Sequence, residues 1–328
     1  MKKLFIAVLA VAGLASCMQD EVLSQDQAAI EFGDAFVDNA TKAIYEGSTE
    51  VDEFKVWGTV KGEGEAVALY NGATVTRGTD ADHDDYNEPW TCTVTRFWTP
   101  NCNYAFYAVV DAADDAVDAP NGVPTSIEYT ADGTTDLLYG ATTKTTKPDL
   151  TVPATPLVAF NMQHLLSKIT FKVTNPESNG DYSYNVKSIT VSGAYASGTY
   201  TFADTAAANA NTGTWVPDTG AMNDLSFTGT TALESTETYA APNAYVIIPG
   251  NPVLTITIVT ETVFGGEVVS PEQTHTLSVN NTGDMTKITF AKNVHYNFGV
   301  ILPAPGAPIE FTISEVDTYG TPQETPIQ

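Results

Sequence analysis

The sequence has few basic residues for its size. Its 328 residues include 14 Lys and Arg against 40 Asp and Glu, which gives a formal net charge of −26 at pH 7. This shortage argues against a nucleic-acid partner, because binding to DNA or RNA depends on Lys and Arg that neutralise phosphates. It also disfavours peripheral binding to an anionic lipid surface. Since 43% of the residues are apolar, the chain can still fold around a core.

Signatures of catalysis and of metal binding are missing as well. The sequence contains no G-x-S-x-G elbow and no H-E-x-x-H motif, and none of its four His residues lies in a recognisable nucleophile or metal context. Residues 80–85 (DADHDD) alternate oxygen ligands as a calcium loop does. However, Asp85 stands where an EF-hand needs Gly, and Thr91 where it needs Glu. We interpret residues 80–85 as a solvated loop, and we predict no enzyme activity, no metal and no cofactor.

One apolar run stands out, and it lies at the N-terminus. Residues 4–14 (LFIAVLAVAGL) follow Lys2 and Lys3. The run is too short for a membrane-spanning helix and has the length of a signal-peptide core. It leads into Leu14-Ala15-Ser16-Cys17, which resembles a bacterial lipobox. We therefore predict that residues 1–16 are a lipoprotein signal peptide and that an acylated Cys17 anchors the exported protein to a membrane.

Cysteine is otherwise scarce, with Cys92 and Cys102 as the remaining thiols. An exported protein meets an oxidising compartment, where two cysteines can form a disulfide. The two residues lie near the starts of strands that we expect to be adjacent. A simple hairpin centred on Pro100 would not place them opposite each other. The pair is a candidate disulfide, and two buried thiols are the alternative.

Helical periodicity is nearly absent, whereas alternation of apolar and polar residues recurs along the whole chain. Residues 169–173 (ITFKV) and 254–258 (LTITI) are typical strands of this kind. Short, evenly spaced strands predict an all-β fold of antiparallel sandwiches. Further strands are expected at residues 30–37, 54–60, 66–76, 91–98, 104–110, 188–192, 244–248, 288–290, 296–302 and 311–313.

The chain divides into a tether and two halves. Residues 17–29 form a polar tether, in which Asp20 and Glu21 resemble the acidic tract that sends some lipoproteins of the Bacteroidetes to the cell surface. A generic tether is the alternative. We place the N-terminal sandwich at residues 30–176 and the C-terminal sandwich at residues 177–328. A break at residues 142–156 is the other option, but it would give halves of less similar size.

Two features suggest contact with carbohydrate. Trp57, Trp90, Trp98 and Trp215 would suit a sugar-stacking platform if they were exposed in a row, although aromatic side chains of a sandwich more often pack in its core. Asp204-Thr205-Ala206 resembles the short O-glycosylation motif of Bacteroidetes, which makes Thr205 a candidate glycosylation site.

Several short segments occur in a fixed order along nearly the whole chain. Together they resemble the fimbrillin family of the Bacteroidales, the Mfa-like and FimA-like subunits of type V pili. The segments are the lipobox at Cys17, Ile30-Glu31-Phe32-Gly33, Phe54-Lys55-Val56-Trp57-Gly58, Phe97-Trp98-Thr99-Pro100, Tyr104-Ala105-Phe106-Tyr107-Ala108, Asp136-Leu137-Leu138-Tyr139, the stretch from Phe160 through His164 to Ile169, and the ending from Tyr296 to Phe311.

The resemblance implies two transthyretin-like β-sandwiches in tandem and assembly by strand exchange. Family members are exported to the outer membrane as lipoproteins, and a trypsin-like protease removes the N-terminal segment with its first strand. A strand from the C-terminal region of another subunit then fills the groove. An added strand restores the ladder of hydrogen bonds and buries alternating side chains. In this chain the candidate donor strand carries Ile309, Phe311, Ile313 and Val316.

Processing is where the sequence departs from the family. Cleavage between Lys42 and Ala43 would remove the strand expected at residues 30–37, but the family protease usually cuts after Arg. Arg77 is a less favourable site, because cutting there would also remove the strand at residues 54–60. The expected function is a structural subunit of an adhesive pilus, with other subunits and a host protein or glycan as partners. The alternative is an outer-membrane surface lipoprotein that binds glycans and does not polymerise.

Overall fold

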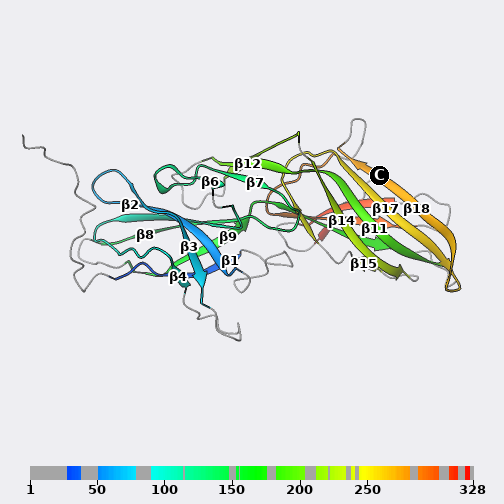
Figure 1. Ribbon diagram of the computed structural model, residues 1–328, viewed down its shortest axis with the longest axis horizontal. Helices are drawn as coiled ribbons and strands as arrows, with labels where there is room; N and C mark the ends of the chain where they lie inside the picture. The colour runs from blue at the N-terminus through cyan, green and yellow to red at the C-terminus, as the bar shows by residue number, and fades with distance from the viewer. Residues whose placement is uncertain are drawn as a thin grey trace, which may run out of the picture.

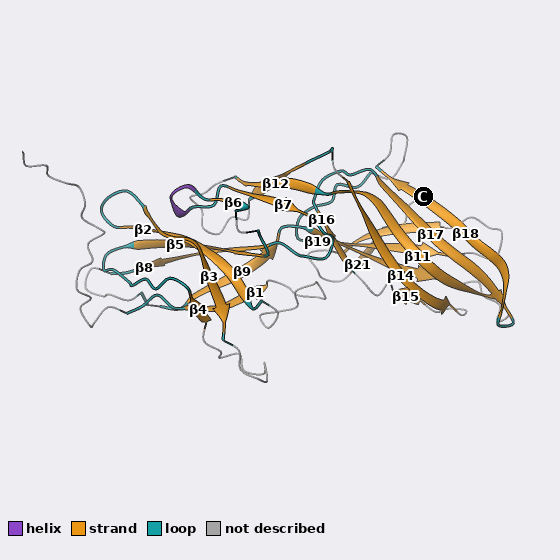
Figure 2. Ribbon diagram, viewed as in Figure 1, coloured by secondary structure: helices purple, strands orange, loops and turns teal. Residues whose placement is uncertain are grey.

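The computed structural model describes residues 28–37, 51–78, 90–113, 115–147, 153–154, 156–175, 182–203, 212–220, 222–233, 238–240, 244–280, 287–302, 310–316 and 322–325. In this part of the chain the fold is all-β, with one 3-10 turn at Pro120–Gly122, as Figure 2 shows. The sequence-based prediction of an all-β fold is therefore confirmed. Within the same residues, no helix is long and apolar enough to cross a membrane.

The N-terminal lobe contains a seven-stranded sheet and a four-stranded sheet (Figure 1). The order in the larger sheet is β1 (Phe32–Val37), β9 (Val158–His164), β8 (Leu138–Thr145), β5 (Asn103–Val110), β2 (Glu53–Lys61), β3 (Val67–Arg77) and β4 (Trp90–Cys92). The smaller sheet has the order β13 (Gly213–Pro217), β12 (Ser197–Phe202), β7 (Ser126–Thr130) and β6 (Val117–Asp118).

The C-terminal lobe also pairs two sheets. One has the order β15 (Thr238–Ala240), β10 (Ser167–Thr174), β19 (Val294–Ile301), β20 (Glu310–Val316) and β21 (Pro322–Thr325), and β16 (Tyr245–Ile247) also pairs with β10. The other has the order β14 (Met222–Leu233), β11 (Tyr182–Tyr195), β17 (Leu254–Phe264) and β18 (Glu267–Val279). Inward residues of both sheets, such as Phe171, Ile256 and Phe298, form one core.

The seven-stranded sheet is covered on both faces in its middle. On β5, Phe106 and Ala108 belong to one core and Tyr107 and Val109 to another. This explains why β5 reads as a continuous apolar run rather than as an alternation, since a strand buried on both faces has no polar side. The first core lies within the curl of the sheet, and the second lies against the four-stranded sheet.

Most expected strands overlap strands of the structure, but β11 and β17 extend well beyond the expected residues, and β8, β14 and β18 were not expected. Two expected strands are wrong in most or all of their length. Residues 91–98 were expected to form one strand, but only Trp90–Cys92 does; Phe97 makes an isolated bridge to Ala29. Residues 288–290 contribute an isolated bridge between Phe290 and Gly250 rather than a strand. Each segment forms a single bridge to a residue far away in the sequence. The alternation of apolar and polar residues within the segment does not reveal that partner.

Among the strand pairs of the described residues, two are parallel and the others are antiparallel. β1 runs parallel to β9, and β10 runs parallel to β19. In each lobe the first strand therefore lies beside a late strand of the same lobe.

The lobes also share a local aromatic motif. In each lobe a tyrosine packs edge to face against an aromatic residue six positions before it: Tyr104 against Trp98, and Tyr296 against Phe290.

Strands from both sides of the expected boundary at residue 176 share one sheet. β12 pairs with β7, and Tyr200 lies opposite Ile127. The core beneath this sheet also holds Leu165 and Val246, which come from the connection between the lobes and from β16. The boundary itself stays a prediction, but the polypeptide on its C-terminal side completes the N-terminal lobe.

Candidate functional site: the slot that holds the first strand

The seven-stranded sheet curls until its two edges meet, and the N-terminal segment of the described chain closes the gap. Ile30 N–H donates a hydrogen bond to the Arg96 carbonyl at 2.8 Å, and Trp98 N–H donates to the Ala28 carbonyl at 3.0 Å. On the other side, Val158 N–H donates to the Glu31 carbonyl at 2.9 Å. We call the space between β9 and residues 96–98, which residues 28–32 fill, the β1 slot. Figure 1 shows β1, β4 and β9 lying together.

Phe32 is the main side chain in the β1 slot. It is 3% exposed, and its ring contacts four aromatic rings from four different strands. The rings of Phe54, Tyr70 and Phe106 meet it edge to face at centroid distances of 6.1, 5.6 and 6.2 Å, and that of Phe160 stacks at 6.4 Å. Removing the N-terminal segment would therefore expose an aromatic pocket.

Two buried polar groups line the same core without a hydrogen-bond partner. They are the hydroxyl of Tyr70 and the indole nitrogen of Trp98. Burial, with a smaller contribution from neighbouring Cys92, raises the pKa of Tyr70. A buried hydrogen-bond donor without a partner lowers the stability of the folded state. The two groups therefore offset part of the stability that the apolar packing of this core provides.

β1 contains an irregularity that decides which residues face the core. Phe32 lies opposite Val158, Ala35 opposite Phe160 and Val37 opposite Met162, with a bulge between Phe32 and Ala35. Val158, Phe160 and Met162 all point into the core. Residues opposite one another in a parallel pair share a face of the sheet, so Phe32, Ala35 and Val37 occupy core-facing positions.

The candidate donor strand lies in the other lobe. β20 pairs with β19 over its whole length without a bulge, with Phe311 opposite Val300, Ile313 opposite Phe298 and Val316 opposite His295. β21 pairs with the other edge of β20. β20 would have to leave β19 to serve another copy, and its role as donor stays a prediction.

Other site residues expected from the sequence lie outside the described residues. These are Cys17, Lys42, Ala43, the 80–85 loop, Thr205 and Ile309. Arg77, the less favourable cleavage site, is described and is 8% exposed. Its guanidinium lies over the Trp90 ring at 5.4 Å, and its backbone N–H donates to the Asp52 carbonyl at 2.8 Å. A protease needs an extended, accessible segment, which Arg77 does not offer.

The structure contains no disulfide between Cys92 and Cys102, although both residues are described. The strands that carry or follow them, β4 and β5, are not adjacent as expected, because β2 and β3 lie between them in the sheet. Cys102 is buried, and its thiol lies 3.4 Å from the Pro100 carbonyl. Burial raises the pKa of the half-buried Cys92 thiol.

The four tryptophans do not form an exposed row. Trp57 and Trp98 are buried. Trp90 packs against Phe54 at 5.2 Å between ring centroids. Trp215 donates a hydrogen bond from its indole nitrogen to the Leu165 carbonyl at 2.7 Å. They pack the cores and the lobe junction, so the stacking platform considered from the sequence is not present.

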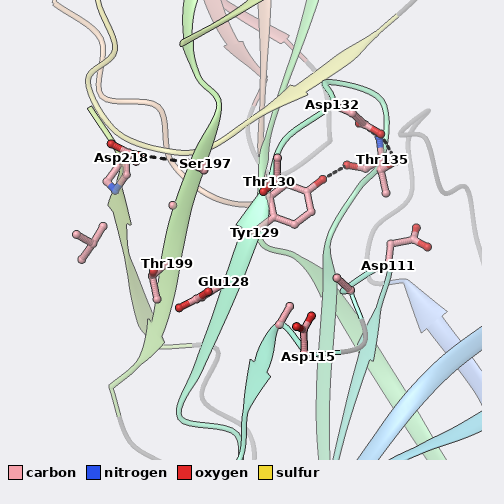
Figure 3. A pocket seen from close by; sticks show the side chains of 15 residues that line it. Asp111, Asp115, Glu128, Tyr129, Thr130, Asp132, Thr135, Ser197, Thr199 and Asp218 are labelled. Carbon is pink, nitrogen blue, oxygen red and sulfur yellow. Dashed lines mark hydrogen bonds between the residues drawn. The ribbon is translucent and has the colours of Figure 1, made fainter. Parts of the chain in front are cut away.

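A hollow of about 670 Å³ lies over the four-stranded sheet of the N-terminal lobe (β13, β12, β7 and β6). Several carboxylates line it, as Figure 3 shows. Asp132 accepts hydrogen bonds from the Thr134 and Thr135 N–H groups, both at 2.7 Å. Partial burial favours a higher pKa for Asp132, but bonds from Thr135 and Thr134 outweigh it and bring the pKa to about 2. Asp218 likewise accepts from Gly220 N–H at 2.9 Å. These two carboxylates stabilise turns, and in the described residues no group of three His, Cys, Asp or Glu could hold a metal.

His164 and Asp136 form a close His–carboxylate pair that is wholly internal. His164 Nδ1 and Asp136 Oδ2 lie 2.5 Å apart, and both residues are 0% exposed. The pair joins the end of β9 to the residues before β8, where the chain leaves the seven-stranded sheet. No substrate reaches it, so its position suits packing rather than catalysis.

Sequence reasoning found the first strand but missed what holds it. Tyr70 was not singled out, and Phe160 was named only as part of a family segment, although both line the β1 slot. Phe160 and Met162 alternate with polar residues on β9, and that pattern was the available signal. Nothing local in residues 96–98 indicates that they pair with residues 28–30.

Comparison with family models identifies the family of this chain. The model of the fimbrillin-like family matches residues 41–315. Comparison with curated proteins finds no match. Among solved structures, a proposed cell adhesion protein from Bacteroides uniformis is similar, with a TM-score of 0.52, 14% identity, and coverage of 89% of this chain and 98% of that chain. A fimbrial protein from Bacteroides vulgatus has a TM-score of 0.49, 15% identity, and coverage of 89% and 99%.

At identities this low, similarity to a solved structure shows the fold alone. The assignment to a family therefore depends on the match to the family model. That match spans most of the chain, from Thr41 to the penultimate residue of β20. It therefore includes parts of both sheets of each lobe, although β1 and β21 lie outside the matched residues. The chain belongs to the fimbrillin-like family.

Proposed function

We propose that this chain is a structural subunit of a type V pilus or a fimbria-associated surface lipoprotein, that it assembles by β-strand exchange, and that it serves cell adhesion. The observation that carries the proposal is the β1 slot. Its occupant comes from the N-terminal end of the described chain and makes backbone hydrogen bonds to both edges of the curled sheet. The same occupant buries Ile30 and Phe32.

The family membership supports a fimbrial and adhesive role, and with it a location at the cell surface. The similar solved structures are themselves described as cell adhesion and fimbrial proteins. In our proposal Cys17 is acylated after removal of residues 1–16, and the protein first reaches the outer membrane as a lipoprotein. Its partners are other pilus subunits and, through the assembled fibre, a receptor on another cell.

Cleavage between Lys42 and Ala43 would create the binding site for the next subunit. It would release β1 and leave Val158 N–H, Trp98 N–H and the Arg96 carbonyl without their present partners. Unpaired backbone groups at a sheet edge favour addition of another strand. Burying an Ile or Phe side chain contributes about 1.5–3 kcal/mol, so refilling the pocket gives a further driving force.

Cleavage after Arg77 fits this scheme less well. It would remove β2 and β3, which lie between β5 and β4 in the seven-stranded sheet. It would also remove Phe54, Val56 and Tyr70 from the core that receives the strand. A lobe without these parts would have no formed slot to fill.

The test is proteolysis of the full chain with an enzyme that cuts after Lys. We expect a new N-terminus at Ala43 by mass spectrometry, followed by ladders of multimers that survive SDS. Lys42→Ala should keep the N-terminal segment and remain monomeric, whereas Lys42→Arg should be trimmed by an Arg-specific protease and assemble. A chain trimmed at Ala43 that remains monomeric would contradict the proposal and favour a surface lipoprotein that does not polymerise.

A further inference from the structure

The segment that fills the β1 slot and the candidate donor strand have closely matching sequences. Residues 28–38 read AAIEFGDAFVD, and residues 307–317 read APIEFTISEVD. Without any gap, the identical pairs are Ala28 and Ala307, Ile30 and Ile309, Glu31 and Glu310, Phe32 and Phe311, Val37 and Val316, and Asp38 and Asp317. Each segment contains a strand of the structure, β1 and β20.

The match is strongest where the strand meets the core. Core-facing positions in the slot are Ile30, Phe32, Ala35 and Val37, from burial and from the register with β9. Their counterparts are Ile309, Phe311, Ser314 and Val316, which are identical except for one small residue in place of another. The substituted positions include Gly33 and Asp34, which lie in the bulge.

We infer that the C-terminal strand of one copy enters the β1 slot of another in this register, as a replica of the first strand. This inference rests on the proposed strand exchange and adds its register, direction and contacts. Ile309 takes the place of Ile30, Phe311 enters the aromatic pocket of Phe32, and Val316 lies opposite Met162. The entering strand runs parallel to β9 and keeps the bulge of β1, so Ile313 lies in the bulge and not in the core.

The backbone of the slot accepts this replacement, including its proline. The two bonds to residues 96–98 use the Ala28 carbonyl and the Ile30 N–H. Their counterparts are the carbonyl of Ala307 and the N–H of Ile309, and Pro308 falls between them in place of Ala29. A proline at this point removes neither bond, and proline is tolerated at strand edges where its nitrogen is not needed.

One contact has to change. At Gly33, where the entering strand carries Thr312, a Cβ atom would lie 2.4 Å from Leu157 Cδ2. Leu157 is 48% exposed, so its side chain has solvent into which it can turn. Gly33 does not have a positive φ, so a threonine there meets no backbone restriction.

A chimera tests the register in the full, uncleaved chain. Four substitutions, Gly33→Thr, Asp34→Ile, Ala35→Ser and Phe36→Glu, turn residues 30–37 into a copy of residues 309–316. We expect the melting temperature to fall by less than about 5 °C, since the core-facing residues are kept. A matched control carries residues 310–317 at positions 30–37. This one-residue shift places Glu at position 30 and Thr at position 32, so its melting temperature should fall by about 10 °C or more.

If the chimera is as unstable as the shifted control, Leu157→Ala is added to it. Recovery supports the register and identifies Leu157 as the contact that must move. A chimera that stays unstable with Leu157→Ala overturns the register, whether or not subunits exchange strands.

Photo-crosslinking tests the partner. The full chain carries benzoyl-phenylalanine at position 311 and is then trimmed at Ala43. Crosslinks to a peptide of another copy that contains Val158–His164 support the inference. Crosslinks between copies at another place mean that strands exchange but that the register is wrong. If position 311 crosslinks only within its own chain, to β19, strand exchange itself is overturned and the proposed function with it.

Discussion

At the scale of single residues, two tyrosines of the N-terminal lobe show opposite solutions to the burial of a hydroxyl. Tyr104 is buried with its oxygen satisfied, since it accepts from Thr99 N–H at 2.6 Å and donates to the Thr99 carbonyl at 3.3 Å. Tyr70 is equally buried, and its hydroxyl has no partner. The first hydroxyl stabilises a turn, whereas the second lowers the stability of the core beside the β1 slot.

This difference predicts opposite effects of the same substitution. Tyr70→Phe should leave the free energy of unfolding unchanged or raise it by about 1 kcal/mol, because it removes a buried group without a partner. Tyr104→Phe is the matched control and should lower the free energy of unfolding by about 1–2 kcal/mol, because the Thr99 N–H loses its partner, although the Thr99 carbonyl keeps its hydrogen bond from the Thr146 hydroxyl. Urea unfolding of the two variants measures both values. A loss of stability in Tyr70→Phe as large as in Tyr104→Phe would show that the Tyr70 hydroxyl is satisfied in solution.

At the scale of elements, β1 contributes to the N-terminal lobe without being central to it. It is an edge strand of the seven-stranded sheet and pairs with β9 alone among the strands. Two sets of contacts keep β1 in place. Residues 28–31 make backbone hydrogen bonds to both sides of the slot, and Phe32 contacts rings from β2, β3, β5 and β9. An edge strand with one large anchor can be removed while the remaining sheet keeps its other pairings.

Phe32→Ala should therefore weaken the closure of the slot in the uncleaved chain. We expect a loss of about 3–5 kcal/mol in the free energy of unfolding, typical of a buried Phe truncated to Ala. Phe264→Ala makes the same change at a residue that is 42% exposed, beside the Gly265-Gly266 turn. This control substitution should lower the free energy of unfolding by less than about 1 kcal/mol. Equal losses in chemical denaturation would mean that Phe32 is not an anchor.

At the scale of the whole molecule, the lobes are joined by more than a linker. The four-stranded sheet takes β6 and β7 from one side of residue 176 and β12 and β13 from the other. Leu165, Leu166, Val246 and Ile248 fill the core below it and come from the connection and from the C-terminal half. Two halves that share a sheet and a core depend on each other for stability.

We predict that the full chain unfolds in one cooperative transition in calorimetry. Ile127→Ala, in the shared sheet, and Phe227→Ala, in the C-terminal core, should each lower the temperature of that same transition. Each truncation should cost about 2–5 kcal/mol. Two separate transitions, each shifted by one of the variants, would instead support independent units divided near residue 176.

Much of the fold could be predicted from the sequence, because the signal for a strand is local. Residues 54–60, 104–110 and 254–258 alternate or run apolar, and the structure places strands there. The strand expected at residues 91–98 was wrong after Cys92, since the later residues pair with the N-terminal segment. The strands that start near Cys92 and Cys102 were expected to be adjacent, and this was wrong for a related reason: order along the chain does not give order in a sheet, and β2 and β3 lie between them.

The sequence by itself determined the all-β class, the family resemblance and a first strand at residues 30–37, because these depend on alternation and on short motifs. Only the tertiary structure decided that this strand runs parallel to β9, closes the sheet against residues 96–98, and bulges so that Ala35 pairs with Phe160 and Val37 with Met162. Pairing between residues far apart in sequence is set by the packing of the whole core. No local pattern encodes which distant edge a strand will meet.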